Sequence, residues 1–150
     1  MKNIIKKIKQ NGGFINAHSH TDRAYTASYF SNEEQYAFLE EKWKLVDKIK
    51  CQSSISDYKK RMMSCVQQQE EFGVSAILSF IDIDEVAGFR AIDAATKVRQ
   101  ESPINFKIAC QTLKGVLDKK HQTMIEFQMP NIDIIGSLPS ADKNKSEHLP

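Results

Sequence analysis

Two histidines separated by one residue follow an apolar segment near the start of the chain. They are His18 and His20, within the stretch FINAHSHTDR at residues 14–23. A β-strand repeats every two residues, so both imidazole rings project from the same face. Two imidazoles at the end of a strand have the donor type and spacing of two ligands for a zinc-like ion. The pattern therefore predicts a metal site that takes two of its ligands from this segment.

Apolar segments typical of buried strands alternate with segments of helical periodicity along the chain. The expected strands are residues 13–18, 75–82, 105–113 and 132–138, and the expected helices are residues 31–49, 56–72, 85–101 and 118–128. This alternation predicts an α/β protein with a parallel sheet. In such folds ligands bind at the carboxyl ends of strands, which is where both histidines fall.

Local signals mark the ends of several of these helices. Ser31, with Glu34 three residues later, forms a capping box that opens the first helix. Gly73 follows the second helix, where a left-handed C-terminal cap is expected. Pro103 ends the third helix, because the residue before a proline avoids helical geometry.

The composition is typical of one globular domain. The 150 residues are 41% hydrophobic, and Lys+Arg 21 against Asp+Glu 19 give a net charge of +2. This small charge does not indicate a nucleic-acid partner, and no apolar run approaches the roughly 20 residues of a membrane span. Cys51, Cys65 and Cys110 are widely spaced in apolar surroundings, so we expect reduced core cysteines in a cytoplasmic protein.

The number of β/α units bounds the architecture. Four units are half of an eight-stranded (β/α)8 barrel, which usually takes about 250 residues. An open doubly wound sheet is the other arrangement that such units can form. We expect residues 1–150 to be a single incomplete domain, a partial TIM barrel with about four of its eight strands.

Other polar residues are expected near the predicted site. Asp82 and Asp84 share one face at the end of the second strand, where they either contact substrate or cap the following helix. Asp22 and Arg23 either orient the loop after the histidines or form a plain surface ion pair. His121 lies in an amphipathic helix and is expected to face solvent.

Residues 16–23, NAHSHTDR, resemble the HxH signature that opens the barrel in the amidohydrolase superfamily. Within that superfamily, the likeness is greatest to cytosine deaminases and their relatives. Residues 79–84, 97–101, 115–117 and 135–139 follow in the same order as similar segments of those enzymes. The resemblance covers nearly the whole chain, and the HxH segment is its most specific part.

The resemblance implies a metal-dependent hydrolase that cleaves a C–N bond, by deamination or amide hydrolysis, in a small cyclic or heterocyclic substrate. It implies one divalent ion, zinc or iron, bound by His18 and His20 together with ligands on later strands. Such an ion makes hydroxide from water near neutral pH. The later ligands and the catalytic proton shuttle are expected beyond residue 150, so this chain alone is expected to be inactive. Residues 136–140, GSLPS, lack the lysine or glutamate that bridges two metals in other members and so favour a single ion.

The resemblance also bears on the substrate. Cytosine deaminases place a glutamine at the end of the third strand to hold the pyrimidine, where this chain has Leu113. Gln111 shares that face two residues earlier, and we expect it to bind substrate together with Asp82. Phe80 stands where those enzymes carry a histidine on the second strand. These differences argue against cytosine itself while keeping the reaction class.

A non-catalytic interpretation stays open. A sheet derived from a truncated barrel could serve as an α/β binding or scaffold domain, in which the two histidines only end a strand. A partial barrel also leaves two edge strands unpaired, and such edges favour association with other strands. We therefore expect self-association through the sheet edges and a small-molecule substrate, with neither nucleic acid nor membrane as a partner.

Overall fold

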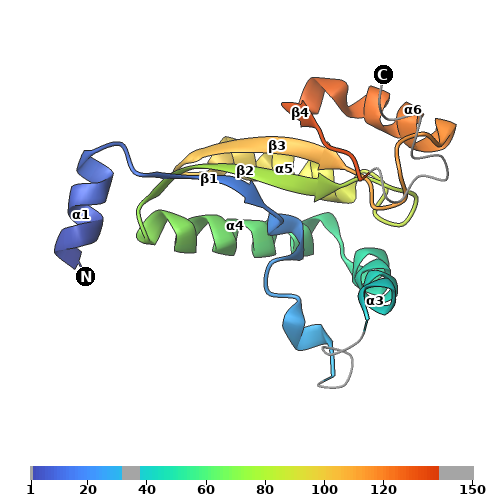
Figure 1. Ribbon diagram of the computed structural model, residues 1–150, viewed down its shortest axis with the longest axis horizontal. Coiled ribbons are helices and arrows are strands. Elements are labelled where there is room, and N and C mark those ends of the chain that lie inside the picture. Colours follow the sequence, from blue (N-terminus) through green and yellow to red (C-terminus); the bar gives the residue numbers. More distant parts are fainter. Residues whose placement is uncertain (1, 32–37, 139–150) are drawn as a thin grey trace.

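The computed structural model describes residues 2–31 and 38–138 of the chain (Figure 1). Its helices are α1 (Lys2–Gln10), α3 (Leu39–Gln52), α4 (Ile55–Glu71), α5 (Arg90–Glu101) and α6 (Lys119–Gln128). Its strands are β1 (Phe14–Ser19), β2 (Val74–Asp82), β3 (Asn105–Gln111) and β4 (Ile134–Ile135). Three short 3-10 helices are η1 (Thr21–Arg23), η2 (Ala27–Tyr29) and η3 (Met129–Asn131).

The strands form one sheet in the order β1-β2-β3-β4, and every neighbouring pair is parallel. Helices α3 and α4 lie between β1 and β2 in the chain, α5 between β2 and β3, and α6 between β3 and β4. The predicted parallel α/β fold is therefore confirmed. The register of β2 and β3 places Asp82 directly beside Gln111 at the carboxyl ends of both strands.

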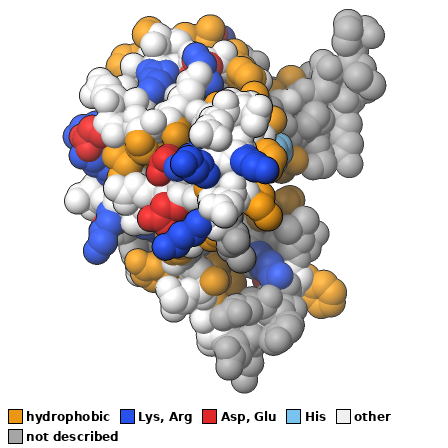
Figure 2. All heavy atoms as spheres, turned by 90° about the vertical axis from the view of Figure 1, so that its left-hand side faces the viewer, with side chains coloured by type: hydrophobic (Ala, Val, Ile, Leu, Met, Phe, Trp, Pro, Cys, Tyr) orange, Lys and Arg blue, Asp and Glu red, His pale blue; other side chains and the backbone are white. Residues whose placement is uncertain are grey.

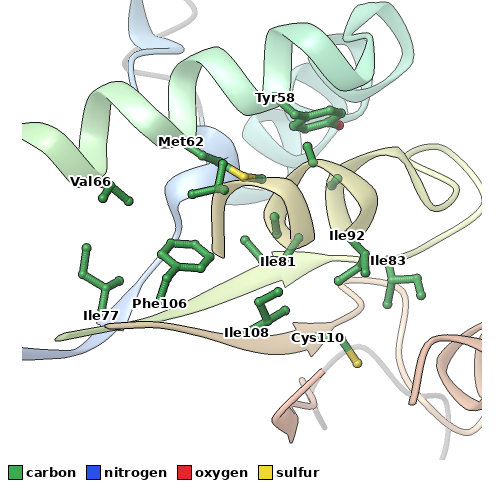
Figure 3. Close-up of a cluster of buried hydrophobic side chains, with 14 of the residues drawn as sticks. Tyr58, Met62, Val66, Ile77, Ile81, Ile83, Ile92, Phe106, Ile108 and Cys110 are labelled. Atoms are coloured by element: carbon green, nitrogen blue, oxygen red, sulfur yellow. The ribbon is translucent and has the colours of Figure 1, made fainter. Parts of the chain in front are cut away.

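The hydrophobic core lies between the sheet and helices α4 and α5, and Figure 3 shows its side chains meeting between these two layers. Met62 and Val66 of α4 are fully buried, as are Ile81 of β2 and Ile108 of β3. Removing this apolar area from water is the main favourable contribution to folding. Helix α6 adds Ile125 to the same cluster.

Short-range hydrogen bonds set the ends of helix α4. Ser54 accepts from the backbone N–H of Asp57 at 3.2 Å, and Asp57 accepts in return from the backbone N–H of Ser54 at 2.9 Å. This is a capping box, which satisfies two N–H groups that the helix itself leaves unpaired. Beyond the helix, Gly73 has φ +91°, so the left-handed cap predicted at this residue is confirmed.

The helix expected over residues 85–101 begins later, at Arg90. The carboxylate of Asp84 accepts the backbone N–H groups of Val86 and Ala87 at 3.0 and 2.8 Å, which makes a turn in place of the first helical turn. Asp84 is thus a cap, as one of its two interpretations expected, but of a turn that precedes α5.

The third and fourth strands are shorter than predicted. Strand β3 ends at Gln111 because the Thr112 hydroxyl accepts the backbone N–H of Lys114 at 3.0 Å and turns the chain. Strand β4 is confined to Ile134–Ile135 rather than residues 132–138, although N–H groups of Asp133 and Gly136 still bond to β3 carbonyls. It is an edge strand with a single described neighbour, and a short edge strand offers few free backbone groups to other strands.

Several expectations outside the sheet can also be compared with the structure. Of the capping box at Ser31, Glu34 lies outside the described residues. All three cysteines are free, and Cys110 is buried, which raises the pKa of its thiol to about 11. Cys51 is exposed, so the expectation of a core position was wrong for it. Helix α3 buries Ile49 and Lys50. Because each residue of a helix is turned by about 100° from the one before it, Cys51 points away from this buried face.

Charged side chains of both signs are interspersed over the face shown in Figure 2, which looks at the end of the molecule that carries α1. Helix α1 contains no buried residue. Its lysines therefore lie on a solvated helix. Within residues 2–31 and 38–138, no helix is long and apolar enough to cross a bilayer.

Met62→Ala is expected to lower the free energy of unfolding by about 2–5 kcal/mol, because it leaves a cavity between α4 and the sheet. Met129→Ala is the matched control. Met129 is 50% exposed, so its loss should change stability by less than about 0.5 kcal/mol. Urea denaturation followed by circular dichroism measures both variants. Similar losses in the two would contradict this assignment of the core.

Candidate functional site

The two histidines lie together at the carboxyl end of β1. His18 is in the strand and His20 follows its last residue, and their ring centroids are 5.3 Å apart with planes at 74°. The ring of Phe80 on β2 packs beside both, at 4.5 Å from His18 and 5.8 Å from His20. The structure therefore places both rings close together at the end of the strand, as predicted.

The chain after His20 folds back onto the end of β2. The Thr21 hydroxyl lies 2.7 Å from that of Ser79, and the Thr21 backbone N–H donates to the Ser79 hydroxyl at 3.0 Å. Asp22 accepts the backbone N–H of Asp82 at 3.0 Å. Thr21 and Asp22 are both almost completely buried, at 1% and 2% exposure. The loop that carries His20 is therefore anchored to the sheet by polar contacts.

Arg23 reaches back from this loop to His20. Its Nη2 lies 2.8 Å from His20 Nδ1 and 3.3 Å from Asp82 Oδ1, and its Nε lies 3.8 Å from Asp22 Oδ1. Of the two interpretations of Asp22 and Arg23, a plain surface ion pair is ruled out, because Asp22 is buried and Arg23 also contacts His20 and Asp82.

A buried lysine from α3 neutralises the end of β2. Lys50 Nζ lies 2.8 Å from Asp82 Oδ2 and 2.7 Å from Asp84 Oδ2, and both carboxylates are completely buried. Gln111 Nε2 donates to Asp82 Oδ1 at 3.2 Å. Asp82 is therefore in contact with side chains from the loop after β1, from α3 and from β3. We call these five residues the Asp82 cluster: Asp82, Asp84, Arg23, Lys50 and Gln111.

The electrostatics of this region follow from burial and neighbouring charge. Burial and the charge of Asp82 raise the pKa of Asp22 to about 6. Burial alone would lower the pKa of Lys50, but Asp82 and Asp84 outweigh it and raise that pKa above its ordinary value. Burial and the charge of Arg23 lower the pKa of His20, which favours the neutral ring.

Two of the residues can hold a metal ion by their chemistry. Neutral imidazoles suit zinc and iron, and His18 and His20 offer two of them on one side of the sheet. Protein sites for zinc take three or four such ligands. Across the described part of the chain, His, Cys, Asp and Glu side chains form no group of three or more that could bind an ion. The pair fits part of a site, and ligation by these two residues stays a prediction.

The two predicted substrate-binding residues lie next to each other. Asp82 is completely buried, and its oxygens contact Lys50, Arg23 and Gln111. Gln111 is 8% exposed and is the last residue of β3. The strand was predicted to reach Leu113, which therefore lies beyond its end. In this arrangement their polar groups contact each other, so substrate binding by either residue stays a prediction.

Sequence reasoning missed Lys50 and misplaced His121. Two aspartates of equal parity at the end of an apolar strand require a buried cation, and that requirement was the signal for Lys50. His121 was expected to face solvent, but it is 6% exposed and its Nε2 lies 2.6 Å from Glu85 Oε2. The reason is tertiary, since α6 packs against the turn after β2 that carries Glu85.

Comparisons with known proteins place the fold. No protein-family model matches the chain. A protein of Haemophilus influenzae that is described as uncharacterized is 38% identical over 148 residues, which cover 93% of this chain and 50% of the relative. The chain thus spans about half the length of that relative.

A 5-methylcytosine deaminase from Klebsiella pneumoniae is similar in structure. Its crystal structure with 5-fluorocytosine gives a TM-score of 0.80 at 19% identity, and covers 90% of this chain and 33% of the deaminase chain. The structure with phosphonocytosine gives 0.74 at 20% identity over the same shares. The chain has the fold of part of a deaminase barrel. The predicted partial barrel and the likeness to cytosine deaminases are therefore confirmed at the level of the fold.

Asp84→Asn is expected to lower the free energy of unfolding by about 3 kcal/mol at pH 7, because one partner of buried Lys50 loses its charge. Burial would raise the pKa of Asp84, but Lys50 and the N–H groups of Ala87 and Val86 outweigh it, so the net pKa is lowered. A lowered carboxylate pKa contributes stability above the unfolded value, and this is lost as the pH falls through the folded value.

The stability difference between the wild type and Asp84→Asn should therefore be full at pH 7 and shrink below about pH 4. Urea denaturation across this pH range measures it. Asp118→Asn is the control, because Asp118 caps α6 from an exposed position and asparagine caps equally well. A pH-independent difference would contradict the Lys50–Asp84 ion pair.

Proposed function

We propose that this chain is part of a metal-dependent hydrolase of the amidohydrolase type. It would act on a C–N bond of a small cyclic or heterocyclic substrate, by deamination or amide hydrolysis, in the cytoplasm. The observation that supports this most is the His18–His20 pair at the carboxyl end of β1, in a sheet with the fold of part of a deaminase barrel. In parallel α/β folds this edge of the sheet is where active sites form.

His18 and His20 would supply two ligands of one divalent ion, zinc or iron. When bound, such an ion lowers the pKa of a water molecule and makes it a nucleophile near neutral pH. The chain's own residues position the ligands. Thr21 and Asp22 anchor the loop after His20 to β2, and Phe80 packs beside both rings and excludes water from one side of them.

The remaining ligands and the proton shuttle would come from further β/α units. Within the described residues β1 and β4 are the two edge strands of the sheet and each pairs with a single neighbour, so further units could pair with both edges. These edges are also where copies of this chain would associate in the absence of such units.

An alternative function is a non-catalytic binding or scaffold domain. It is favoured by the contacts that already engage the rings, because Arg23 lies on His20 and Phe80 packs on His18. In that case the histidines would have no metal to bind, and zinc would not change the properties of the chain.

Zinc binding separates these two functions. After chelator treatment, the full chain titrated with zinc in a calorimeter is expected to bind one ion. His18→Ala and His20→Ala should each weaken binding by tenfold or more, as loss of a ligand removes more than the roughly tenfold effect of losing a supporting contact. His121→Gln is the control, because it removes an imidazole but keeps an amide donor near Glu85. Equal binding by all four proteins, or no binding, would favour the scaffold.

Turnover by the isolated chain is a separate matter. With added zinc and either cytosine or 5-methylcytosine, we expect no release of ammonia, since the described residues supply two candidate ligands and no third. An ammonia assay at micromolar chain concentration measures this. Clear turnover that disappears in His18→Ala would show that the chain holds a complete site, against the partial-barrel proposal.

A further inference from the structure

The contact between Arg23 and His20 has a defined polarity. A guanidinium group has five N–H donors and no acceptor, so in a hydrogen bond with His20 Nδ1 the ring nitrogen must accept. A neutral imidazole with an accepting Nδ1 carries its proton on Nε2. At 2.8 Å, the contact with Arg23 therefore selects one of the two tautomers of His20.

This tautomer is the opposite of the one that His20 would need to bind an ion through Nε2, and in the tautomer it does have, Arg23 occupies the free nitrogen Nδ1. A histidine that binds an ion through one ring nitrogen normally donates from the other, to a carboxylate or a carbonyl. Binding through Nε2 would move the proton to Nδ1, which could then no longer accept from Arg23. Binding through Nδ1 would displace Arg23 directly. Either way, the Arg23 hydrogen bond and an ion on His20 exclude each other.

Two carboxylates, those of Asp82 and Asp22, hold Arg23 in this position. Asp82 Oδ1 lies 3.3 Å from Arg23 Nη2, and Asp22 Oδ1 lies 3.8 Å from Arg23 Nε. Asp82 is itself held by Lys50 at 2.8 Å and by Gln111 at 3.2 Å. The side chain of Arg23 is 24% exposed, so its charge is partly shielded from water.

We propose that Arg23 is a positioning residue that competes with a divalent ion for His20. In the metal-free chain it donates to His20 Nδ1, and an ion binds only when this hydrogen bond is released. The carboxylates of Asp82 and Asp22 are the positions to which the guanidinium withdraws. This inference rests on the proposed metal site, and its first test does not require metal binding.

The first experiment reads the tautomer in the wild type. The full chain, labelled with ¹⁵N-histidine and freed of metal, is examined by long-range ¹H–¹⁵N NMR, with His20 assigned from a His20→Gln variant. We expect an unprotonated Nδ1 and a protonated Nε2 on His20. In Arg23→Met the two tautomers should become mixed. A protonated Nδ1 in the wild type would overturn the proposal whether or not the chain binds metal.

The second experiment measures competition. Zinc alone is titrated into Arg23→Met, which should bind more tightly than the wild type by about tenfold or more, the effect of removing one hydrogen bond to a charged group. Arg99→Met is the matched control, because it removes the same charge from an ion pair with Asp133, which precedes β4 at the edge of the sheet opposite β1. It should bind zinc as the wild type does.

The outcomes are distinguishable. Equal affinity in Arg23→Met and Arg99→Met, with the expected tautomer in the wild type, would show that Arg23 orients the ring without competing for it, against the proposal. Zinc binding by neither the wild type nor Arg23→Met would overturn the proposed function and the competition with it. Circular dichroism shows whether each variant is folded, and the wild-type NMR result stands independently of the variants.

Discussion

The carboxylate of Asp82 is completely buried at the end of β2, and a buried charge is costly unless several groups compensate it. Lys50, Arg23 and Gln111 do so, and each comes from a different part of the chain. Burying such ion pairs adds little net stability over apolar packing, but breaking one is strongly destabilising. The Asp82 cluster therefore fixes how the loop after β1, helix α3 and strand β3 meet at the end of β2. Because Arg23 also contacts His20, the cluster helps to position that ring.

The second constraint is the shape of the sheet. Helices α4 and α5 cover one face, and Figure 1 shows β1 and β4 at the two edges. Large apolar side chains at these edges are about half exposed or more, including Phe14 and Ile134 at 55% and 47%. A sheet with the fold of one third of a deaminase chain and apolar edges is suited to continue into further β/α units. A rim of strand ends is where ligands of several units would converge.

The order of elements was predictable because each depends on nearby residues. Apolar runs predicted β2 and β3, and Gly73 predicted the left-handed residue after α4, which has φ +91°. The boundaries that failed were decided by side chains that competed for backbone groups. Asp84 delayed the start of α5, and Thr112 ended β3 early. Neither competition changes the periodicity of the sequence, so periodicity could not reveal it.

The sequence by itself determined that His18 and His20 share one side of a strand end, because strand geometry alternates side chains residue by residue. Only the tertiary structure decided what surrounds them. Arg23 contacts Asp82, which is 59 residues away in the sequence, and Lys50 contacts Asp84, which is 34 residues away. Contacts at such separations depend on how helices pack on the sheet. The same packing buried His121 against Glu85, although its helix alone indicated a solvent-facing residue.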